Sequence, residues 1–566
     1  MLYHCYVLVL LLVCGQCILR PKRCPNSSQC NVVSNRAMQR GGAPVVYAKS
    51  VQQSEERQES SSIRYTPAQV LVVLESERSP SYFTKKPVGS AVAWSEVFEH
   101  LQEKLSWEAT NNRFDSSLGD LGISILMLGS GGQEICVDAP VLLLVGLKTK
   151  EHLDAVRELS NNRTTVVALD CAEEYQQLET YGGGSFVPRL EATSPSNNFA
   201  QIMDWAQTFF DAGGGSKAQH RRTYETVQEV KGRRSTDDIL FLLMVLINEY
   251  YPPFRGQLSS VVSATSSDKT GLGELGCMCT KCGKQMASCL TDPTCKKALD
   301  CLNKCKSNDQ VCAYRCITSY ETERFQEFAF CILQRNNCMG NKATIPTTPD
   351  PAPLSSFRGV PLTHEVAEGI FEGWLRPREG EENALLPASA NLVPQSWMVV
   401  CGVNPAYDYF SDQHQIFYRE RARRSIMWYD PVFKVETLDG EQVWRRRHYR
   451  VRRGELPGQF RFTVIDNGVL SDEYWRILDC DDDLGWAVFY YGGAAAAAGT
   501  SYTGGLIVTR SGDWPEGMDD VNSDTHRRVA AALAKGGIKL YEVYPVGSTL
   551  SSPGLNSAGP PPLGIL

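Results

Sequence analysis

Short aliphatic runs alternate with helical stretches in the first half of the chain. The runs are rich in Val, Ile and Leu, as is typical of strands buried on both faces of a sheet. They are Val70–Leu74, Ile123–Leu128, Val141–Val145 and Thr165–Leu169, and two stretches around 93–105 and 150–159 are helical in pattern. This alternation predicts a small α/β layer domain over residues 65–255, whose role the pattern does not indicate.

One further helix is predicted at the end of this region, over Ser235–Tyr250. The hydroxyl of Ser235 can accept a hydrogen bond from the amide of Asp238, and acidic residues in a first turn favour a helix N-terminus. The apolar core of the helix, Ile239–Ile247, is too short for a membrane span, so a buried helix is expected.

The pattern changes to short Val, Ile, Tyr and Trp runs in residues 392–546. Turn sequences such as Asp439-Gly440 and Asn467-Gly468 separate these runs, which predicts antiparallel β-structure, a sandwich or a barrel. The preceding residues 341–391 are expected to form a Pro-rich linker with a helical insertion, and the Pro, Gly and Ser of residues 547–566 predict a disordered tail.

Residues 1–60 are expected to be a targeting presequence and linker. Tyr6–Cys14 is an apolar run of h-region length, and basic residues follow it before the first acid, Glu55. This suits a signal or a plastid transit peptide, with a disordered tail as the alternative. The net charge of −7 gives no support for a nucleic-acid-binding protein.

Eleven of the 20 cysteines fall between Cys277 and Cys338, in a predicted domain over residues 275–340. Such density is typical of disulfide scaffolds in oxidising compartments. The alternative is a zinc site, but the cluster lacks His and does not repeat a Cys-x2-Cys unit. Disulfides are therefore favoured and no metal is expected. The cysteines concerned are Cys277, Cys279, Cys282, Cys289, Cys295, Cys301, Cys305, Cys312, Cys316, Cys331 and Cys338.

The spacing within this cluster predicts particular disulfides. Cysteines at i and i+4 share one helix face, and two such helices packed antiparallel would join outer with outer and inner with inner cysteines. The expected pairs are Cys301–Cys316, Cys305–Cys312 and, by proximity, Cys331–Cys338. Outside the cluster, Cys401 can pair with Cys480. An odd number of cysteines leaves at least one thiol free or paired elsewhere.

The cysteine string from Cys277 to Cys338 resembles the cysteine-rich domain of the violaxanthin de-epoxidase family. The order continues with WMVVCGVNP from Trp397, TLDG from Thr437, WRIL from Trp475, FYY from Phe489 and TR from Thr509, which resemble the family's lipocalin domain. The resemblance covers about residues 277–515. Because the α/β residues have no counterpart in the enzyme itself, the chain looks most like the violaxanthin de-epoxidase-related branch.

The resemblance implies a multidomain fold: an N-terminal α/β domain, a small helical disulfide-rich domain and a C-terminal antiparallel β-barrel of the lipocalin type. It also implies a xanthophyll-epoxide substrate, ascorbate as reductant, and a chloroplast location, with the thylakoid lumen suiting the cysteines. The alternatives are a non-catalytic carotenoid-binding lipocalin, another xanthophyll-epoxide-modifying enzyme, and a disulfide-rich interaction protein.

Site residues follow from the same resemblance. An acid inside the barrel is implied to protonate the epoxide, which needs a carboxylic acid held in an apolar pocket. The candidates are Glu473 and its neighbour Asp472, because a one-residue slip in a strand exchanges the two faces. The implied substrate-binding residues are Trp397, Asp408, Tyr449, Trp475 and Tyr491, and Arg510 is expected to cover the ring of Trp397.

Two histidines and two basic runs complete the candidates. His414 and His448 are each either a pH sensor or a solvated surface residue. The runs Arg419–Arg424 and Arg445–Arg453 can dock on anionic lipid, here a thylakoid membrane surface, or simply face solvent. Nucleic acid is a distant third partner because no recognised module is present.

Overall fold

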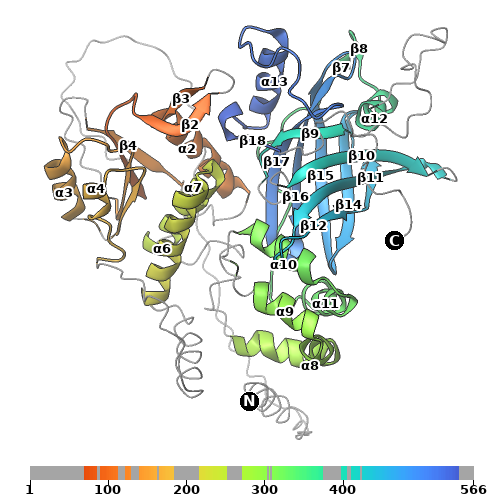
Figure 1. Ribbon diagram of the computed structural model, residues 1–566, viewed down its shortest axis with the longest axis horizontal. Coiled ribbons are helices and arrows are strands. Elements are labelled where there is room, and N and C mark those ends of the chain that lie inside the picture. The colour runs from red at the N-terminus through yellow and green to blue at the C-terminus, as the bar shows by residue number, and fades with distance from the viewer. Residues whose placement is uncertain are drawn as a thin grey trace, which may run out of the picture.

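The structure is a computed structural model, shown in Figure 1. It describes residues 69–85, 89–111, 121–128, 139–161, 163, 165–183, 216–251, 271–302, 305, 309–373, 397–404, 410–420 and 423–546. The presequence over residues 1–60 and the tail over residues 547–566 therefore lie outside the described residues. The α/β region lies at the left of Figure 1, the barrel at the right, and the helices of the cysteine-rich region below the barrel.

A parallel sheet forms the centre of the α/β region. Its strands follow the order β4-β1-β5-β6, and each is one of the aliphatic runs of the sequence. The helices α2, α6 and α7 pack on one face and α3 and α4 on the other. The elements are β1 (Val70–Leu74), β2 (Pro80–Lys85), β3 (Ser90–Ala93), α2 (Trp94–Thr110), β4 (Ile123–Met127), β5 (Val141–Val145), α3 (Leu153–Asn161), β6 (Thr165–Leu169), α4 (Glu173–Gln176), α6 (Ser216–Arg233) and α7 (Thr236–Tyr250).

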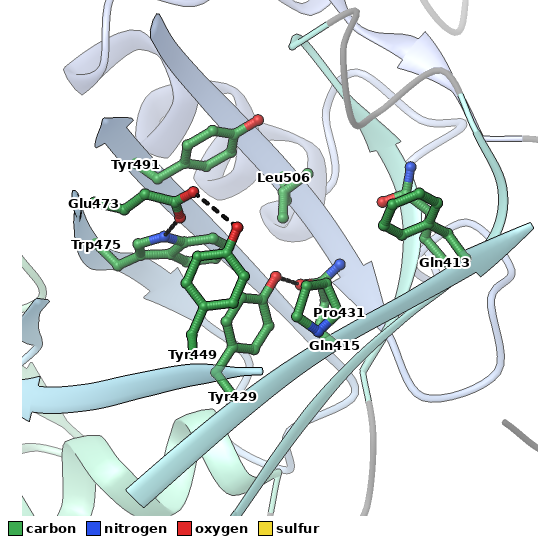
Figure 2. A pocket seen from close by; sticks show the side chains of 10 residues that line it. Gln413, Gln415, Tyr429, Pro431, Tyr449, Glu473, Trp475, Tyr491 and Leu506 are labelled. Atoms are coloured by element: carbon green, nitrogen blue, oxygen red, sulfur yellow. Dashed lines mark hydrogen bonds between the residues drawn. The ribbon is translucent and has the colours of Figure 1, made fainter. Parts of the chain in front are cut away.

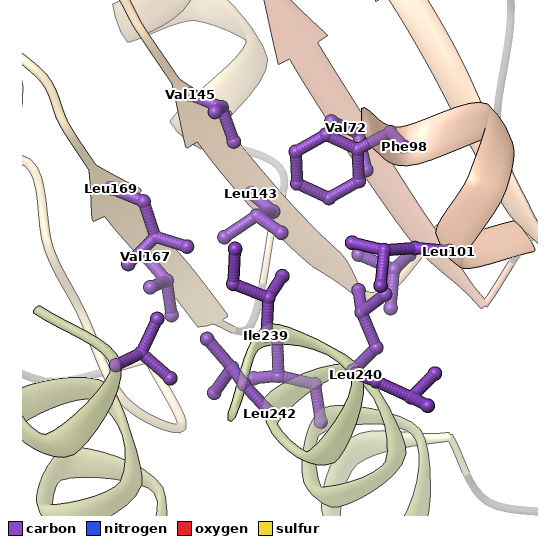
Figure 3. Packing of buried hydrophobic residues seen from close by; sticks show 14 of the residues in the cluster. Val72, Phe98, Leu101, Leu143, Val145, Val167, Leu169, Ile239, Leu240 and Leu242 are labelled. Atoms are coloured by element: carbon purple, nitrogen blue, oxygen red, sulfur yellow. The ribbon is translucent and has the colours of Figure 1, made fainter. Parts of the chain in front are cut away.

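Burial on both faces explains why these strands are continuously apolar. Alternate residues of β1 belong to two different clusters, Val72 to the one under α2 and α7 and Val73 to the one under α3. Figure 3 shows Leu143 and Val167 of the sheet packed against Ile239 of α7. The predicted α/β layer is confirmed.

The cap predicted for α7 is also present. The amide of Asp238 donates to Oγ of Ser235 at 3.0 Å, which satisfies one of the free donors of the first turn. The helix is buried over almost its whole length. Within the described parts of the chain, no helix is both long enough and apolar enough to cross a membrane.

Five disulfides join the helices of the cysteine-rich region. The helical elements are α8 (Gly271–Thr291), α9 (Pro293–Leu302), α10 (Gln310–Tyr320), α11 (Glu323–Ala329) and the π-helix η3 (Phe330–Arg335). The pairs are Cys277–Cys338, Cys282–Cys331, Cys289–Cys295, Cys301–Cys316 and Cys305–Cys312. The two pairs predicted from the i, i+4 spacing are confirmed, and Cys279 is the member of the cluster outside these five pairs.

Two predicted disulfides are wrong. Cys331 and Cys338 do not bond to each other, because α8 lies along α11 and η3 and supplies a partner for each of them. Cys401 does not bond Cys480, because the two side chains belong to different clusters on opposite faces of the barrel wall. Cys480 faces the interior, and burial raises the pKa of its thiol.

The C-terminal part is a closed antiparallel barrel of eight strands. Neighbours follow the order β10-β11-β13-β14-β15-β16-β17-β9, and pairing of β9 with β10 closes the ring. Strand β12 pairs with β11, and β18 pairs with β9, both antiparallel. The strands are β9 (Trp397–Gly402), β10 (Ser411–Glu420), β11 (Arg423–Glu436), β12 (Gln442–Arg446), β13 (Tyr449–Arg453), β14 (Gln459–Asp466), β15 (Val469–Cys480), β16 (Trp486–Ala495), β17 (Thr500–Thr509) and β18 (Tyr544–Pro545).

Shorter elements precede and follow the barrel. They are β7 (Ser356–Phe357), β8 (Val360–Pro361), α12 (His364–Glu372), the 3-10 turn η4 (Ala496–Ala498), α13 (Asp524–Lys535) and the 3-10 turn η5 (Leu540–Glu542). Helix α13 covers the outer face of β15 and β16, where Val529 and Leu533 pack on Trp486 and Tyr490.

A buried ionic cluster connects the α/β region to the C-terminal segment. Glu542 of η5 is fully buried, and its carboxylate contacts Nε2 of His100 at 2.8 Å and Nζ of Lys104 at 2.6 Å, both from α2. The hydroxyl of Thr236 donates to the same carboxylate at 2.8 Å. Two residues beyond Glu542, Tyr544 pairs with Gly402 of the barrel, so one short segment contacts both regions.

Candidate functional site

Helix α12 closes one end of the barrel. Thr363 caps its N-terminus by accepting from the amide of Val366, and Gly373 ends it with φ of 65°, where glycine avoids the strain of a side chain. The ring of Phe371 enters the barrel, with ring centroids 4.5 Å from Phe460 and 4.7 Å from Phe489. This end of the barrel is therefore filled by side chains.

Trp397 and Arg510 hold this closed end together. The guanidinium of Arg510 lies 5.9 Å from the ring centroid of Trp397, as the sequence predicted. The indole Nε1 of Trp397 donates to the carbonyl of Ile370 at 3.0 Å, and Arg510 donates to the carbonyl of Gly373 at 2.6 Å. Both contacts reach α12, so the structure places Trp397 at the barrel base and not among the pocket residues.

A narrow pocket lies in the rest of the interior (Figure 2). Three of the predicted substrate-binding residues, Tyr449, Trp475 and Tyr491, line it. The full lining is Gln413, Gln415, Tyr429, Pro431, Phe433, Tyr449, Glu473, Trp475, Tyr491 and Leu506. The site is thus an aromatic pocket with few polar groups, as small-molecule sites usually are.

Glu473 is the acid of this pocket. Its carboxylate accepts from Nε1 of Trp475 at 2.6 Å, from the hydroxyl of Tyr502 at 2.7 Å and from the hydroxyl of Tyr449 at 3.3 Å. Burial raises the pKa of Glu473 above its usual value, although the three donors oppose that rise. A carboxyl group whose pKa is raised in an apolar site is suited to general acid chemistry.

Asp472 lies on the other face of the same strand. Side chains alternate along β15, so Asp472 points outward, where its carboxylate accepts from the hydroxyl of Thr463 at 2.8 Å. The pocket wall includes Glu473 and does not include Asp472. As a correction, Asp472 is not the acid inside the barrel. Asp408 lies outside the described residues.

Two cross-strand rows explain how the pocket is built. In the first row, Glu473 is opposite Gly493, and Gly493 is opposite Tyr502. A methyl group on Gly493 would come within 2.6 Å of the ring of Tyr502, so the missing side chain is what lets Tyr502 lie across the row and reach Glu473. In the second row, Tyr491 lies over Gly504 in the same way and stacks on Trp475, with the two ring centroids 4.9 Å apart.

Sequence reasoning missed several pocket residues. Leu506 comes from β17, and Gln413 and Gln415 come from β10. Tyr502, also on β17, was missed as well; it donates to Glu473 without lining the pocket itself. On that far side of the pocket, the hydroxyl of Tyr429 donates to Oε1 of Gln415. Gly493 and Gly504 were the sequence feature that could have indicated these rings, because a small residue in one strand often leaves room for a ring from the next.

The two barrel histidines occupy different environments. His414 is buried, which corrects the expectation of a surface residue, and burial lowers its pKa to about 4. His448 is partly exposed, stacks on Trp428 at 4.1 Å between centroids, and has Nδ1 2.8 Å from Oδ1 of Asp430. Neither histidine lines the pocket.

The cysteine-rich helices contact the barrel at the end opposite α12. Tyr314 of α10 packs on Phe410 and Phe433, the second of which lines the pocket. The β14–β15 turn also touches this region, because the backbone of Phe330 lies within 2.5 Å of where a Cβ on Gly468 would be. The disulfide-linked helices therefore border the open end of the pocket.

Comparisons with known proteins agree with this architecture. Residues 274–542 match the family model described as the VDE lipocalin domain. The chain is 22% identical over 249 residues to violaxanthin de-epoxidase, chloroplastic, of Nicotiana tabacum, covering 43% of this chain and 45% of the relative. It is 23% identical over 267 residues to the Arabidopsis thaliana protein of the same name, covering 46% and 50%. The chain thus spans about half the length of the curated relatives it matches.

A solved structure, the major allergen Per a 4 from cockroaches, aligns with 27% of this chain and 85% of its own length, at 10% identity and a TM-score of 0.20. That score is too low to support an argument. The assignment to the related branch stays a prediction. For residues 274–542, the family model and the curated relatives together confirm the resemblance to the violaxanthin de-epoxidase family.

Proposed function

We propose that this chain is a violaxanthin de-epoxidase-like oxidoreductase, and that its barrel binds one end of a xanthophyll epoxide. The observation that supports this most directly is Glu473, a fully buried carboxyl group with a raised pKa in an aromatic pocket. Similarity to relatives named violaxanthin de-epoxidase supports the same function. The pocket has ten lining residues and is too small for a whole carotenoid, so the polyene chain extends out of it.

Glu473 is assigned the role of general acid. In its protonated form it donates a proton to the epoxide oxygen as the carbon–oxygen bonds break. Two electrons and a second proton are needed to release that oxygen as water and leave a carbon–carbon double bond. Ascorbate supplies both and becomes dehydroascorbate, and a proton from solvent returns Glu473 to its protonated form. The epoxide, ascorbate and one proton from solvent therefore give the alkene, dehydroascorbate and water.

The aromatic residues are assigned to substrate positioning. Trp475 and Tyr491 stack on each other and offer flat apolar faces to a ring or polyene. Tyr449 and Tyr502 both donate to Glu473 and so fix the position of its carboxyl group. Gln415, on the opposite wall, offers a polar group to a hydroxyl on the substrate ring.

The location proposed for the chain is the chloroplast, and within it the thylakoid lumen. The relatives are named as chloroplastic proteins. Five disulfides in one small region need an oxidising compartment, and the lumen meets that need.

Pigment turnover tests the proposal. The purified, oxidised chain would be given violaxanthin dispersed in lipid with ascorbate, and the pigments separated by chromatography. We expect de-epoxidised products from the unaltered chain and from Asp472→Asn, and none from Glu473→Gln. Pigment binding measured by fluorescence quenching should persist in Glu473→Gln.

The matched pair makes the outcome decisive, because the two carboxylates are adjacent but face opposite sides of the wall. Equal turnover in Glu473→Gln and the unaltered chain would refute the assignment of the acid. Binding of pigment without turnover in the unaltered chain would replace the enzyme by a carotenoid-binding lipocalin. Turnover to a rearranged epoxide would indicate another xanthophyll-modifying reaction.

A further inference from the structure

Three arginines form an exposed group on the outer face of the barrel. Arg450 and Arg452 project from β13 and Arg461 from β14, and all three are exposed. Arg452 and Arg461 are directly opposite each other in the register of these strands. Like charges in that arrangement repel and destabilise a sheet. The fold therefore keeps an unfavourable pair that a structural role does not explain.

Five other arginines of the two basic runs have internal partners. They form ion pairs as follows: Arg419 with Glu368 and Glu372, Arg445 with Glu321, Arg446 with Asp430, Arg447 with Asp466, and Arg453 with Glu365 and Glu368. Among the described residues, Arg450, Arg452 and Arg461 form no such ion pair. The basic runs thus divide into a structural set and an outward set, which Arg461 joins from the next strand.

Aromatic residues flank the outward set on both sides. Trp428 of β11 is the cross-strand neighbour of Arg450, and Tyr474 of β15 is the cross-strand neighbour of Arg461. The one acid in the same rows is Asp472 of β15, which is separated from Arg450 by Thr463 and accepts a hydrogen bond from that threonine.

Exposed apolar side chains continue this face toward the open end of the barrel. Ile465 of β14 is 64% exposed, and Phe330 of η3, beside the β14–β15 turn, is 41% exposed. A surface that contacts lipid headgroups typically combines arginines with Trp and Tyr at its rim and exposed apolar side chains beside them. An acidic peptide would need the arginines but not the apolar neighbours.

We propose that the outer face of β13 and β14, centred on Arg450, Arg452 and Arg461, docks on an anionic lipid surface. The proposal deepens the proposed function and rests on it for the nature of the substrate, a pigment dissolved in lipid. The same wall faces the pocket with Tyr449, Glu473 and Trp475, so docking would bring the pocket to within one layer of strands of the membrane. The docked state would also neutralise the repulsion between Arg452 and Arg461.

Vesicle co-sedimentation tests this surface. The full chain would be mixed with phosphatidylcholine vesicles, with and without about 30% phosphatidylglycerol. We expect binding to the anionic vesicles only, weakened by salt. The double variant Arg452→Gln, Arg461→Gln should bind about 25-fold more weakly, at about fivefold for each arginine. The control variant Arg157→Gln, Arg527→Gln removes the same charge from exposed positions elsewhere, and its binding should not change.

The outcomes separate the docking surface from the proposed function. An equal loss of binding in both double variants, or no binding to anionic vesicles by the unaltered chain, would overturn the docking face. Binding of the chain to poly-glutamate without any vesicle binding would assign the face to an acidic protein. Turnover of detergent-dissolved violaxanthin should be the same in the Arg452→Gln, Arg461→Gln variant. Vesicle binding by a chain that lacks turnover would leave the docking face standing and refute only the enzyme.

The variant is also expected to fold at least as well as the unaltered chain. Removing a repulsive cross-strand pair should leave thermal unfolding unchanged or shift it upward. A large drop in the unfolding temperature would show that the arginines stabilise the barrel and would refute the premise of the proposal.

Discussion

Substitution of Gly493 by alanine should disturb the pocket acid from a neighbouring strand. The new Cβ would lie 2.6 Å from the ring of Tyr502 and 2.8 Å from its hydroxyl oxygen, closer than real side chains approach. Because Tyr502 crosses Gly493 to donate to Glu473, the ring must either move away or be compressed. The substitution therefore tests the row Glu473–Gly493–Tyr502 as a unit.

Both responses have a similar cost. If the ring moves, the hydrogen bond to Glu473 is lost, and a bond to a charged or buried carboxyl group contributes about 1.5–3 kcal/mol. If the ring stays, overpacking costs about 1–3 kcal/mol. We expect Gly493→Ala to lower the free energy of unfolding by about 2 kcal/mol. Loss of the Tyr502 donor should also raise the pKa of Glu473 further, because that donor lowers it.

Urea unfolding of the barrel, followed by tryptophan fluorescence, measures the first effect. The control is Gly492→Ala, one residue away on the opposite face, where the new Cβ would meet its nearest neighbours at an ordinary 3.8 Å. Adding Tyr502→Ala removes the ring, so Gly493→Ala should cost little in that background. Equal stability of Gly493→Ala and Gly492→Ala would refute the placement of Tyr502 across the row.

The pH dependence of turnover measures the second effect. A general acid works while it is protonated, so activity falls as pH rises through the pKa of Glu473. A higher pKa in Gly493→Ala or Tyr502→Phe should move that fall to higher pH. A shift to lower pH would contradict the role of Tyr502 as a donor to the carboxylate.

Three further predictions concern stability. Glu542→Gln should cost about 3 kcal/mol in urea unfolding, because it removes the nearer charge partner of the buried Lys104 and leaves only Asp237, at 3.6 Å. The pKa of Glu542 is lowered, chiefly by Lys104. The stability that Glu542 contributes is therefore complete above the unfolded pKa of a glutamate and is lost only as pH falls through its folded pKa. Unfolding measured at mildly acidic pH should still show this stability. Cys305→Ser with Cys312→Ser should cost about 2–4 kcal/mol in thermal unfolding monitored by circular dichroism, whereas an effect of zero would show that the bridge does not constrain the chain. Arg510→Met should cost about 1 kcal/mol and change tryptophan fluorescence at the barrel base, and unchanged emission would contradict the stacking.

The sequence was most informative where one physical requirement determined the pattern. Strands buried on both faces must be apolar throughout, so Val70–Leu74, Val141–Val145 and Thr165–Leu169 were predicted with their observed bounds. The hairpin turns were visible for a similar reason. Gly440 and Gly468 both have positive φ in the structure, a conformation that glycine adopts without strain.

Long-range pairing was harder to predict. The nested disulfides of α9 and α10 follow from spacing on two adjacent helices, whereas Cys331 and Cys338 find their partners on α8, at sequence separations of 49 and 61 residues. Spacing alone could not bring α8 next to η3. The same nested order, outer with outer and inner with inner, also holds for Cys277 and Cys282 with Cys338 and Cys331, but these cysteines do not have the i, i+4 spacing on which the prediction was based.

The candidate site shows the same division between local and long-range information. The resemblance indicated the strand that holds the acid, but two adjacent acids left the choice of face open until the register of β14 and β15 was known. Gln413 and Gln415 line the same pocket as Glu473 only because β9 pairs with both β10 and β17 and so closes the ring. A residue contributed by ring closure has no signal in its own strand, since its neighbours in space are set by strands far away in the chain.

The α/β region gains a physical role from its contacts, even though its sequence indicates none. Glu542 ties α2 and α7 to the segment that continues into β18, and β18 pairs with β9, the strand that begins at Trp397 of the barrel base. A buried charge cluster tolerates little misplacement, because each group loses its partner if the surfaces separate. Movement of the α/β region would therefore be resisted where β18 pairs with Cys401 and Gly402, at the end of β9 away from Trp397. Gly402 also pairs with Leu506, which lines the pocket. This arrangement predicts that weakening the Glu542 cluster disturbs the pocket wall at Leu506 before it disturbs Trp397.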